Sequence, residues 1–167
     1  MRRMHITTGC SDALDGRREA VLERWLQAVI ATYPPDAAKF MLGQQDRFHN
    51  PVGHALREGL GKLFDGLRAG SGDAELTAAL DGIVRIRAVQ EFAPSAAVGF
   101  VYGLKAILRE ELRGSGVAAA DLAALEDGVD RLALLAFDVY MQCRERLFDI
   151  RVREIREHQL FVARAGA

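Results

Sequence analysis

The chain has 167 residues, half of them hydrophobic and 27% charged, which is typical of one globular domain with a full core. Its net charge is −1 and its arginines alternate with carboxylates, so nucleic acid is excluded as an expected partner. No apolar run approaches the roughly 20 residues that span a bilayer, so direct membrane insertion is not expected. Two distant cysteines, and an N-terminus without the apolar segment of a signal peptide, predict a cytoplasmic protein.

The N-terminal part is predicted to hold two helices behind a loose end. Residues 1–10 are expected to be disordered or loosely attached. A helix capped by Ser11 is predicted to run to about Tyr33, because the Pro-Pro pair that follows cannot continue a helix. A short helix is then expected from Asp36 to Gly43.

A helix start is predicted at Asn50 and Pro51. Asparagine accepts hydrogen bonds from the free amides of the first turn, and proline fits a position that needs no amide donor. The helix that follows contains four glycines, although each interior glycine costs about 0.5–1 kcal/mol relative to alanine. This density predicts close approach either of another helix or of a ligand. The four are Gly53, Gly59, Gly61 and Gly66.

Three more helices are predicted in the second half of the chain. The first begins at Asp73 and ends at about Gln90, and the second covers residues 95–113. The last is the longest and covers residues 119–158, with a tail at 159–167. No stretch alternates with a period of two, so no strand is expected. The predicted fold is therefore all-α: a single-domain bundle of about six helices with a long C-terminal helix.

A polar cluster lies where the helix from Asp73 ends. It contains Arg85, Arg87, Gln90 and Glu91, directly before the helix break at Pro94. Such a cluster either binds an anion or holds a loop in register.

The first part of the long helix is apolar nearly all round. Residues 132–143 are therefore predicted to be covered on several sides by the rest of the chain. Asp138 falls inside this stretch, and a buried carboxylate is costly unless it is paired. Either it pairs with an arginine (Arg47, Arg85 or Arg87) or it points out of a half-buried helix.

After Cys143 the helix becomes charged and keeps only a narrow apolar stripe. This extension either packs on a second copy or a partner, or stands in solvent, or folds back on its own domain. The candidate dimer or partner surface consists of Leu147, Ile150, Arg151, Glu154 and Ile155.

No catalytic motif is found. There is no serine elbow, no phosphate-binding loop, no His-Glu-x-x-His and no zinc-type cysteine spacing, so neither an enzyme nor a metal site is expected. His49 and His54 lie at the start of a helix, and a single histidine is the axial ligand of some haem proteins. They are therefore the candidate ligands if haem is bound, and no cofactor is the first expectation.

Several segments resemble, in content and order, the N-terminal domain of the RsbRD-type RsbT co-antagonist proteins of bacterial stress signalling. The likeness covers about Leu14 to Arg156. None of its specific pieces is catalytic. The pieces are Phe48-x-Asn50-Pro51-x-Gly53, Arg85-x-Arg87-Ala88-Val89-Gln90 and the AFDVYMQCRE run that contains Asp138.

The resemblance implies a sensory domain that pairs as a dimer. In related co-antagonists this domain has a globin-like helical fold without haem, and a helix leads from it into a phosphorylated STAS domain. This sequence ends at Ala167 without a STAS domain, so the sensory module alone is expected. A looser helical bundle is the alternative to a globin-like arrangement.

Two functions are weighed from these features. The first is a non-enzymatic sensory or regulatory module that acts through protein contacts. It would form a homodimer and contact an unidentified partner: a kinase, a STAS-type regulator or a subunit of a redox complex. The alternative is a small-molecule or haem sensor, with the ligand between the glycine-rich helix and the last helix.

Overall fold

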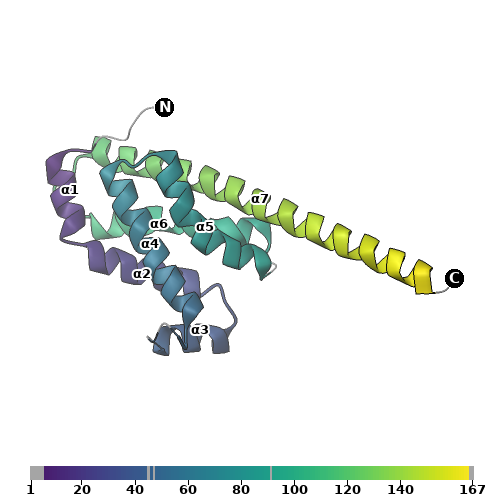
Figure 1. Ribbon diagram of the computed structural model, residues 1–167. Helices are drawn as coiled ribbons and strands as arrows, with labels where there is room; N and C mark the ends of the chain where they lie inside the picture. Colours follow the sequence, from purple (N-terminus) through teal and green to yellow (C-terminus); the bar gives the residue numbers. More distant parts are fainter. Residues whose placement is uncertain (1–5, 45, 47, 91, 166–167) are drawn as a thin grey trace.

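The computed structural model describes residues 6–44, 46, 48–90 and 92–165, with side chains up to residue 159. Within these residues the chain forms seven α-helices and no strand (Figure 1). The predicted all-α, single-domain fold is confirmed. The helices are α1 (Thr8–Asp15), α2 (Arg18–Ile30), α3 (Pro35–Gly43), α4 (Pro51–Ala69), α5 (Asp73–Val89), α6 (Pro94–Glu111) and α7 (Ala119–Ala165).

The body has three layers. Helices α5 and α6 form the middle layer, α7 covers one side of it, and α4 and α2 pack on the other side. One continuous core of buried apolar side chains joins the layers. Trp25 of α2 is fully buried in this core, and its indole nitrogen donates to the Phe100 carbonyl at 2.9 Å. Helix α3 lies at the end of the body, below α2 and α4, and contacts both (Figure 1).

The N-terminal prediction is wrong in two respects. Residues 6–10 are ordered, because Thr7 caps α1 and is itself held by Asp121 of α7; the amide and hydroxyl of Thr7 donate to that carboxylate at 3.0 and 2.6 Å. Cys10 is consequently buried. The single helix expected from Ser11 to Tyr33 is two helices, because the chain turns at Gly16. Residues 1–5 lie outside the described part.

The glycines of α4 do allow a second helix to approach closely. A Cβ added at Gly59 would lie 2.7 Å from Cγ1 of Ile83, and one added at Gly66 would lie 2.9 Å from Cδ2 of Leu76. Both neighbours belong to α5. Of the two explanations that the sequence left open for these glycines, helix packing therefore accounts for these two positions.

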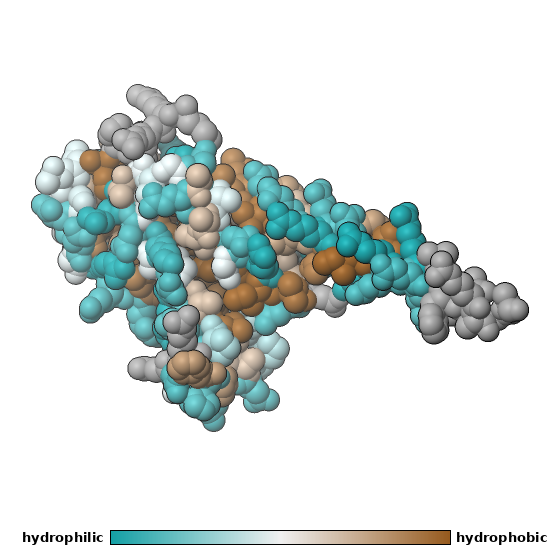
Figure 2. All heavy atoms as spheres, viewed as in Figure 1, coloured by the Kyte–Doolittle hydropathy of each residue, from teal (hydrophilic) through white to brown (hydrophobic). Residues whose placement is uncertain are grey.

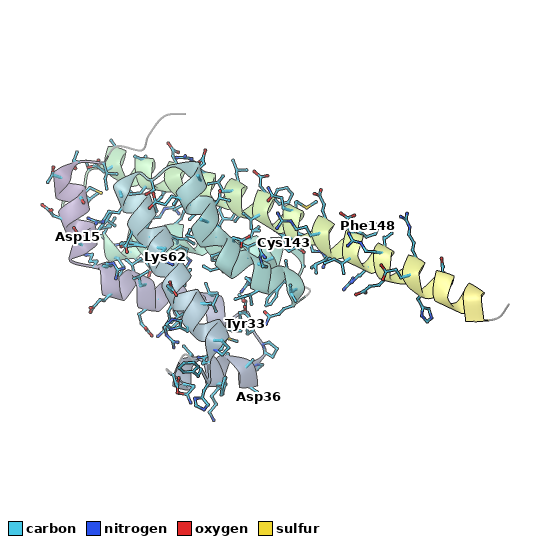
Figure 3. All side chains as sticks on the ribbon, viewed as in Figure 1. Asp15, Tyr33, Asp36, Lys62, Cys143 and Phe148 are labelled. Carbon is cyan, nitrogen blue, oxygen red and sulfur yellow. The ribbon has the colours of Figure 1, made fainter. Side chains whose placement is uncertain are left out.

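Helix α7 is longer than predicted and extends beyond the body. Its 47 residues span about 70 Å at the usual rise of an α-helix. Cys143 is its last buried residue among those whose side chains are described, and Figure 3 shows Cys143 on the body and Phe148 on the extension. Nothing in the described chain covers this extension.

Candidate functional site

One side of α7 carries large apolar side chains that stay exposed. Leu134 on the body is 67% exposed, and Phe148 on the extension is 65% exposed. Starting from Leu134, every seventh residue is an exposed apolar side chain, so these side chains follow one side of the helix. We call this stripe, with Phe137 one turn after Leu134, the α7 seam; it consists of Leu134, Phe137, Met141, Phe148 and Ile155. Hydrophobic residues are visible among hydrophilic ones along the extension in Figure 2.

Helix α6 borders the seam. Lys105 of α6 contacts Asp130 of α7 at 2.7 Å, and Asp130 lies one turn before the seam begins. Tyr102, one turn before Lys105, is half exposed. A Cβ added at Gly99 or Gly103 would meet nothing within 4 Å. The apolar surface therefore continues onto α6, where two glycines leave room for close approach from outside.

The prediction that residues 132–143 are covered on several sides is wrong. The side chains of Leu134, Phe137 and Met141 are exposed, because α5 and α6 cover only one side of α7. Asp138 is also exposed and points out of the half-buried helix, the second of the two alternatives for this residue. Arg47, one of its candidate partners, lies outside the described residues.

The candidate partner surface predicted from the sequence lies on the extension. Leu147 and Ile150 continue the inward side of α7 past the end of the body, whereas Ile155 belongs to the seam. Arg151 and Glu154 lie on the same part of the helix and are exposed. The role of these five residues in pairing stays a prediction.

Asn50 joins α3 to α4. Its side-chain oxygen accepts from the Gly53 amide at 2.9 Å, as predicted for a helix cap. Its amide nitrogen also donates to the carbonyls of Met41 and Gln44, at 2.9 and 2.7 Å. Asn50 is buried and its polar atoms are satisfied by backbone groups, so its role is structural.

The two arginines of the RIRAVQ segment have different environments. Arg85 is exposed and contacts Asp81 one turn away, at 2.9 Å. Arg87 is completely buried and has no carboxylate partner among the described residues. Its Nη2 donates to the Thr32 hydroxyl at 3.0 Å and to the Ala96 carbonyl at 2.9 Å, so it connects α5 to the end of α2 and the start of α6.

Three aromatic rings surround the guanidinium of Arg87. The centroids of the Phe92, Tyr33 and Phe100 rings lie 4.2, 5.3 and 5.7 Å from its Cζ atom. Burial lowers the pKa of Arg87, with Tyr33 acting in the opposite direction. Burial also raises the pKa of Tyr33, so its phenol stays protonated. The result is a buried cation in an aromatic cage, stabilised by cation–π contacts.

The candidate haem ligands are on the surface. The side chain of His49 is 70% exposed, and its Nδ1 lies 2.7 Å from Asp46. His54 lies 3.6 Å from Glu58 on the next turn of α4. The amide of Phe48 and the imidazole of His49 lower the pKa of Asp46. Phe48 itself is 91% exposed. Haem binding stays a prediction that this geometry does not test.

Comparison with known proteins now decides the family. The family model of the RsbT co-antagonist protein RsbRD N-terminal domain matches residues 19–155. The chain belongs to the RsbRD N-terminal domain family. It is also 27% identical, over 142 residues, to an uncharacterized protein of Archaeoglobus fulgidus, and the match covers 82% of this chain and 83% of that protein. No solved structure matches.

Membership supports a stressosome-like regulatory role for this RsbRD N-terminal domain. Within the described residues, no group of three or more His, Cys, Asp or Glu side chains is placed to hold a metal ion. No helix there is both long enough and apolar enough to cross a membrane.

Two features of this RsbRD N-terminal domain were missed from the sequence. The α7 seam was missed because residues 132–143 were expected to be covered on several sides, although the seven-residue spacing was visible in the sequence. The cage around Arg87 was missed because its members come from three separate segments. The sequence alone does not show that Arg87 is buried whereas Arg85 is exposed.

Proposed function

We propose that this domain is a non-enzymatic regulatory module that acts through protein contacts and forms a homodimer through the α7 seam. One observation carries the proposal: large apolar side chains recur every seven residues along α7, from the body onto the extension, and remain exposed. Apolar side chains at a seven-residue spacing occupy one of the two repeating positions by which two helices pack along one another. Exposed apolar stripes of this length mark protein interaction sites.

A second copy of the chain is the occupant that fits the seam best. A partner helix with the same repeat would cover the seam along its whole length, on the body and on the extension together. Tyr102 adds an exposed aromatic side chain beside it, and aromatic residues are enriched at interfaces. Gly99 and Gly103 leave room for the second copy to approach α6 closely.

The paired extensions would then present their charged sides to a further partner in the cytoplasm. Arg151 and Glu154 lie on this part of α7. A kinase, a STAS-type regulator or a subunit of a redox complex is the class of partner we propose. Signals received by the body would be transmitted along α7, since it is the element that joins the body to the extension.

Sedimentation equilibrium of the purified chain tests the dimer. The wild type should sediment as a dimer, and the double variant Leu134→Glu/Phe148→Glu as a monomer, because two buried carboxylates without partners oppose association. The matched control is Leu42→Glu/Val89→Glu, which alters two exposed apolar residues outside the seam. A monomeric wild type, or a double variant that stays dimeric, would overturn the proposal.

A further inference from the structure

A cavity of about 430 Å³ lies at the end of the body, between the end of α2, α3, the start of α4 and the α5–α6 connection. Its lining is mainly apolar and includes Ala37, Met41 and Val52. Asn50 also lines it, but the donors of its amide are already used by backbone carbonyls. The volume lies in the range of pockets that hold small organic molecules.

One wall of the cavity is also a wall of the arginine cage. Tyr33 and Phe92 line the cavity, and their rings meet edge to face with centroids 5.1 Å apart. On the other side of this pair lies Arg87, whose Cζ is 4.2 Å from the Phe92 centroid. Figure 3 labels Tyr33 where the body meets α3. The guanidinium therefore lies one aromatic side chain behind the cavity surface.

The guanidinium is only partly satisfied, because its hydrogen bonds to Thr32 and Ala96 use Nη2 alone. Nε and Nη1 of Arg87 and the Tyr33 hydroxyl are buried, and none of them has a hydrogen-bond partner within 3.5 Å among the described residues. Tyr33 is nonetheless near enough to Arg87 to oppose the lowering of its pKa. None of the ion pairs within the described chain involves Arg87. Arginine remains charged in proteins, and a buried cation without a counter-ion is costly. The C-terminal dipole of α5 and the aromatic rings offset only part of this cost.

We propose that this cavity binds a small amphipathic monocarboxylate. Its apolar body fills the cavity, and the positive charge of Arg87, behind Tyr33 and Phe92, attracts its carboxylate to this end of the cavity. The attraction acts across an aromatic wall of low polarity, where it is stronger than in water. A neutral ligand of the same shape gains only the apolar contact, and a cation is repelled.

Calorimetric titration of the full chain with three probes of equal length tests the charge preference. The probes are octanoate, octan-1-ol and octylammonium. Octanoate should bind at least about tenfold more tightly than octan-1-ol, which corresponds to about 1.4 kcal/mol, and octylammonium should bind most weakly. Equal binding of octanoate and octan-1-ol would overturn the proposal, and so would the absence of octanoate binding at millimolar concentration. This comparison requires no variant.

Three substitutions test the location. Ala37→Trp fills the cavity and should abolish binding of octanoate. Arg87→Met should reduce octanoate affinity to that of octan-1-ol, whereas Arg85→Met removes an exposed arginine nearby and should change nothing. If Arg87→Met does not fold, Arg87→Lys keeps the charge and should keep the octanoate preference. A folded Arg87→Met that retains this preference would contradict the proposal.

The proposed ligand site is independent of the proposed dimer, so an experiment can contradict one proposal and leave the other standing. The seam variant Leu134→Glu/Phe148→Glu should bind octanoate as the wild type does, because the seam lies outside the cavity. Conversely, Ala37→Trp should lose octanoate binding and remain a dimer. These two results together would show that the ligand site and the dimer interface are separate.

Discussion

A Cβ placed on Gly59 would lie 2.7 Å from Cγ1 of Ile83, a distance that real Cβ contacts do not adopt. Ile83 is completely buried and β-branched, so its side chain has little freedom to move. The contact between Gly59 and Ile83 therefore sets how closely α4 and α5 pack.

Gly59→Ala should lower the free energy of unfolding by about 1–2 kcal/mol. Overpacking costs about 1–3 kcal/mol, and the gain in helix propensity returns less than 1 kcal/mol. Gly82→Ala is the matched control on α5, where an added Cβ meets nothing within 4 Å, and it should stabilise the protein. Urea unfolding monitored by circular dichroism gives both values. If Gly59→Ala and Gly82→Ala changed the free energy of unfolding in the same direction, the packing explanation would be refuted.

Asn50→Asp should destabilise the protein by about 2–3 kcal/mol. Aspartate and asparagine are equivalent as simple helix caps, but aspartate cannot donate to the carbonyls of Met41 and Gln44, and it places a charge beside them. The exposed Asp36→Asn is the control and should change stability by less than about 0.5 kcal/mol. If thermal unfolding shows Asn50→Asp to be neutral, the asparagine serves only as a cap.

The ion pair between Arg18 and Asp65 predicts a specific pH dependence. Two hydrogen bonds of 2.8 and 2.7 Å join the side chains, and Arg18 lowers the pKa of Asp65. A lowered folded-state pKa gives stability that is present above the unfolded pKa and is lost as pH falls through the folded value. Both side chains are partly exposed, so the pair contributes only about 0.5–1 kcal/mol.

Asp65→Asn should therefore be less stable than the wild type at pH 7, and the difference should decrease below about pH 4, near the ordinary pKa of aspartate. Urea unfolding of both proteins at pH 7, 4 and 3 measures this difference. A difference that stays constant across these values would show that Asp65 acts by packing or hydrogen bonding alone.

Local chemistry made part of the fold predictable. Asn50 and Pro51 determine a helix start by their own backbone preferences, and the start lies where it was predicted. The glycines of α4 could be assigned to close packing because helical glycine is costly without such a reason. The partners Ile83 and Leu76 could not be named, since they depend on how α5 packs on α4.

Long-range contacts were not predictable. Thr7 orders the N-terminus through Asp121, which is 114 residues away. The hydrophobicity of residues 132–143 did not reveal how many sides of α7 are covered. Arg85 and Arg87 point to nearly opposite sides of α5, about half a turn apart, and only the packed structure decides which of them is buried.

The central claim is that the α7 seam pairs with a second copy, and hydrogen–deuterium exchange of residues 148–158 tests it most directly. A single helix standing in solvent exchanges fast, whereas a paired helix is protected. Above the dissociation concentration, exchange in this segment should be slowed and the particle should have twice the 18.3 kDa of one chain; dilution should abolish both. Fast exchange at every concentration, with the mass of a single chain, would contradict the account.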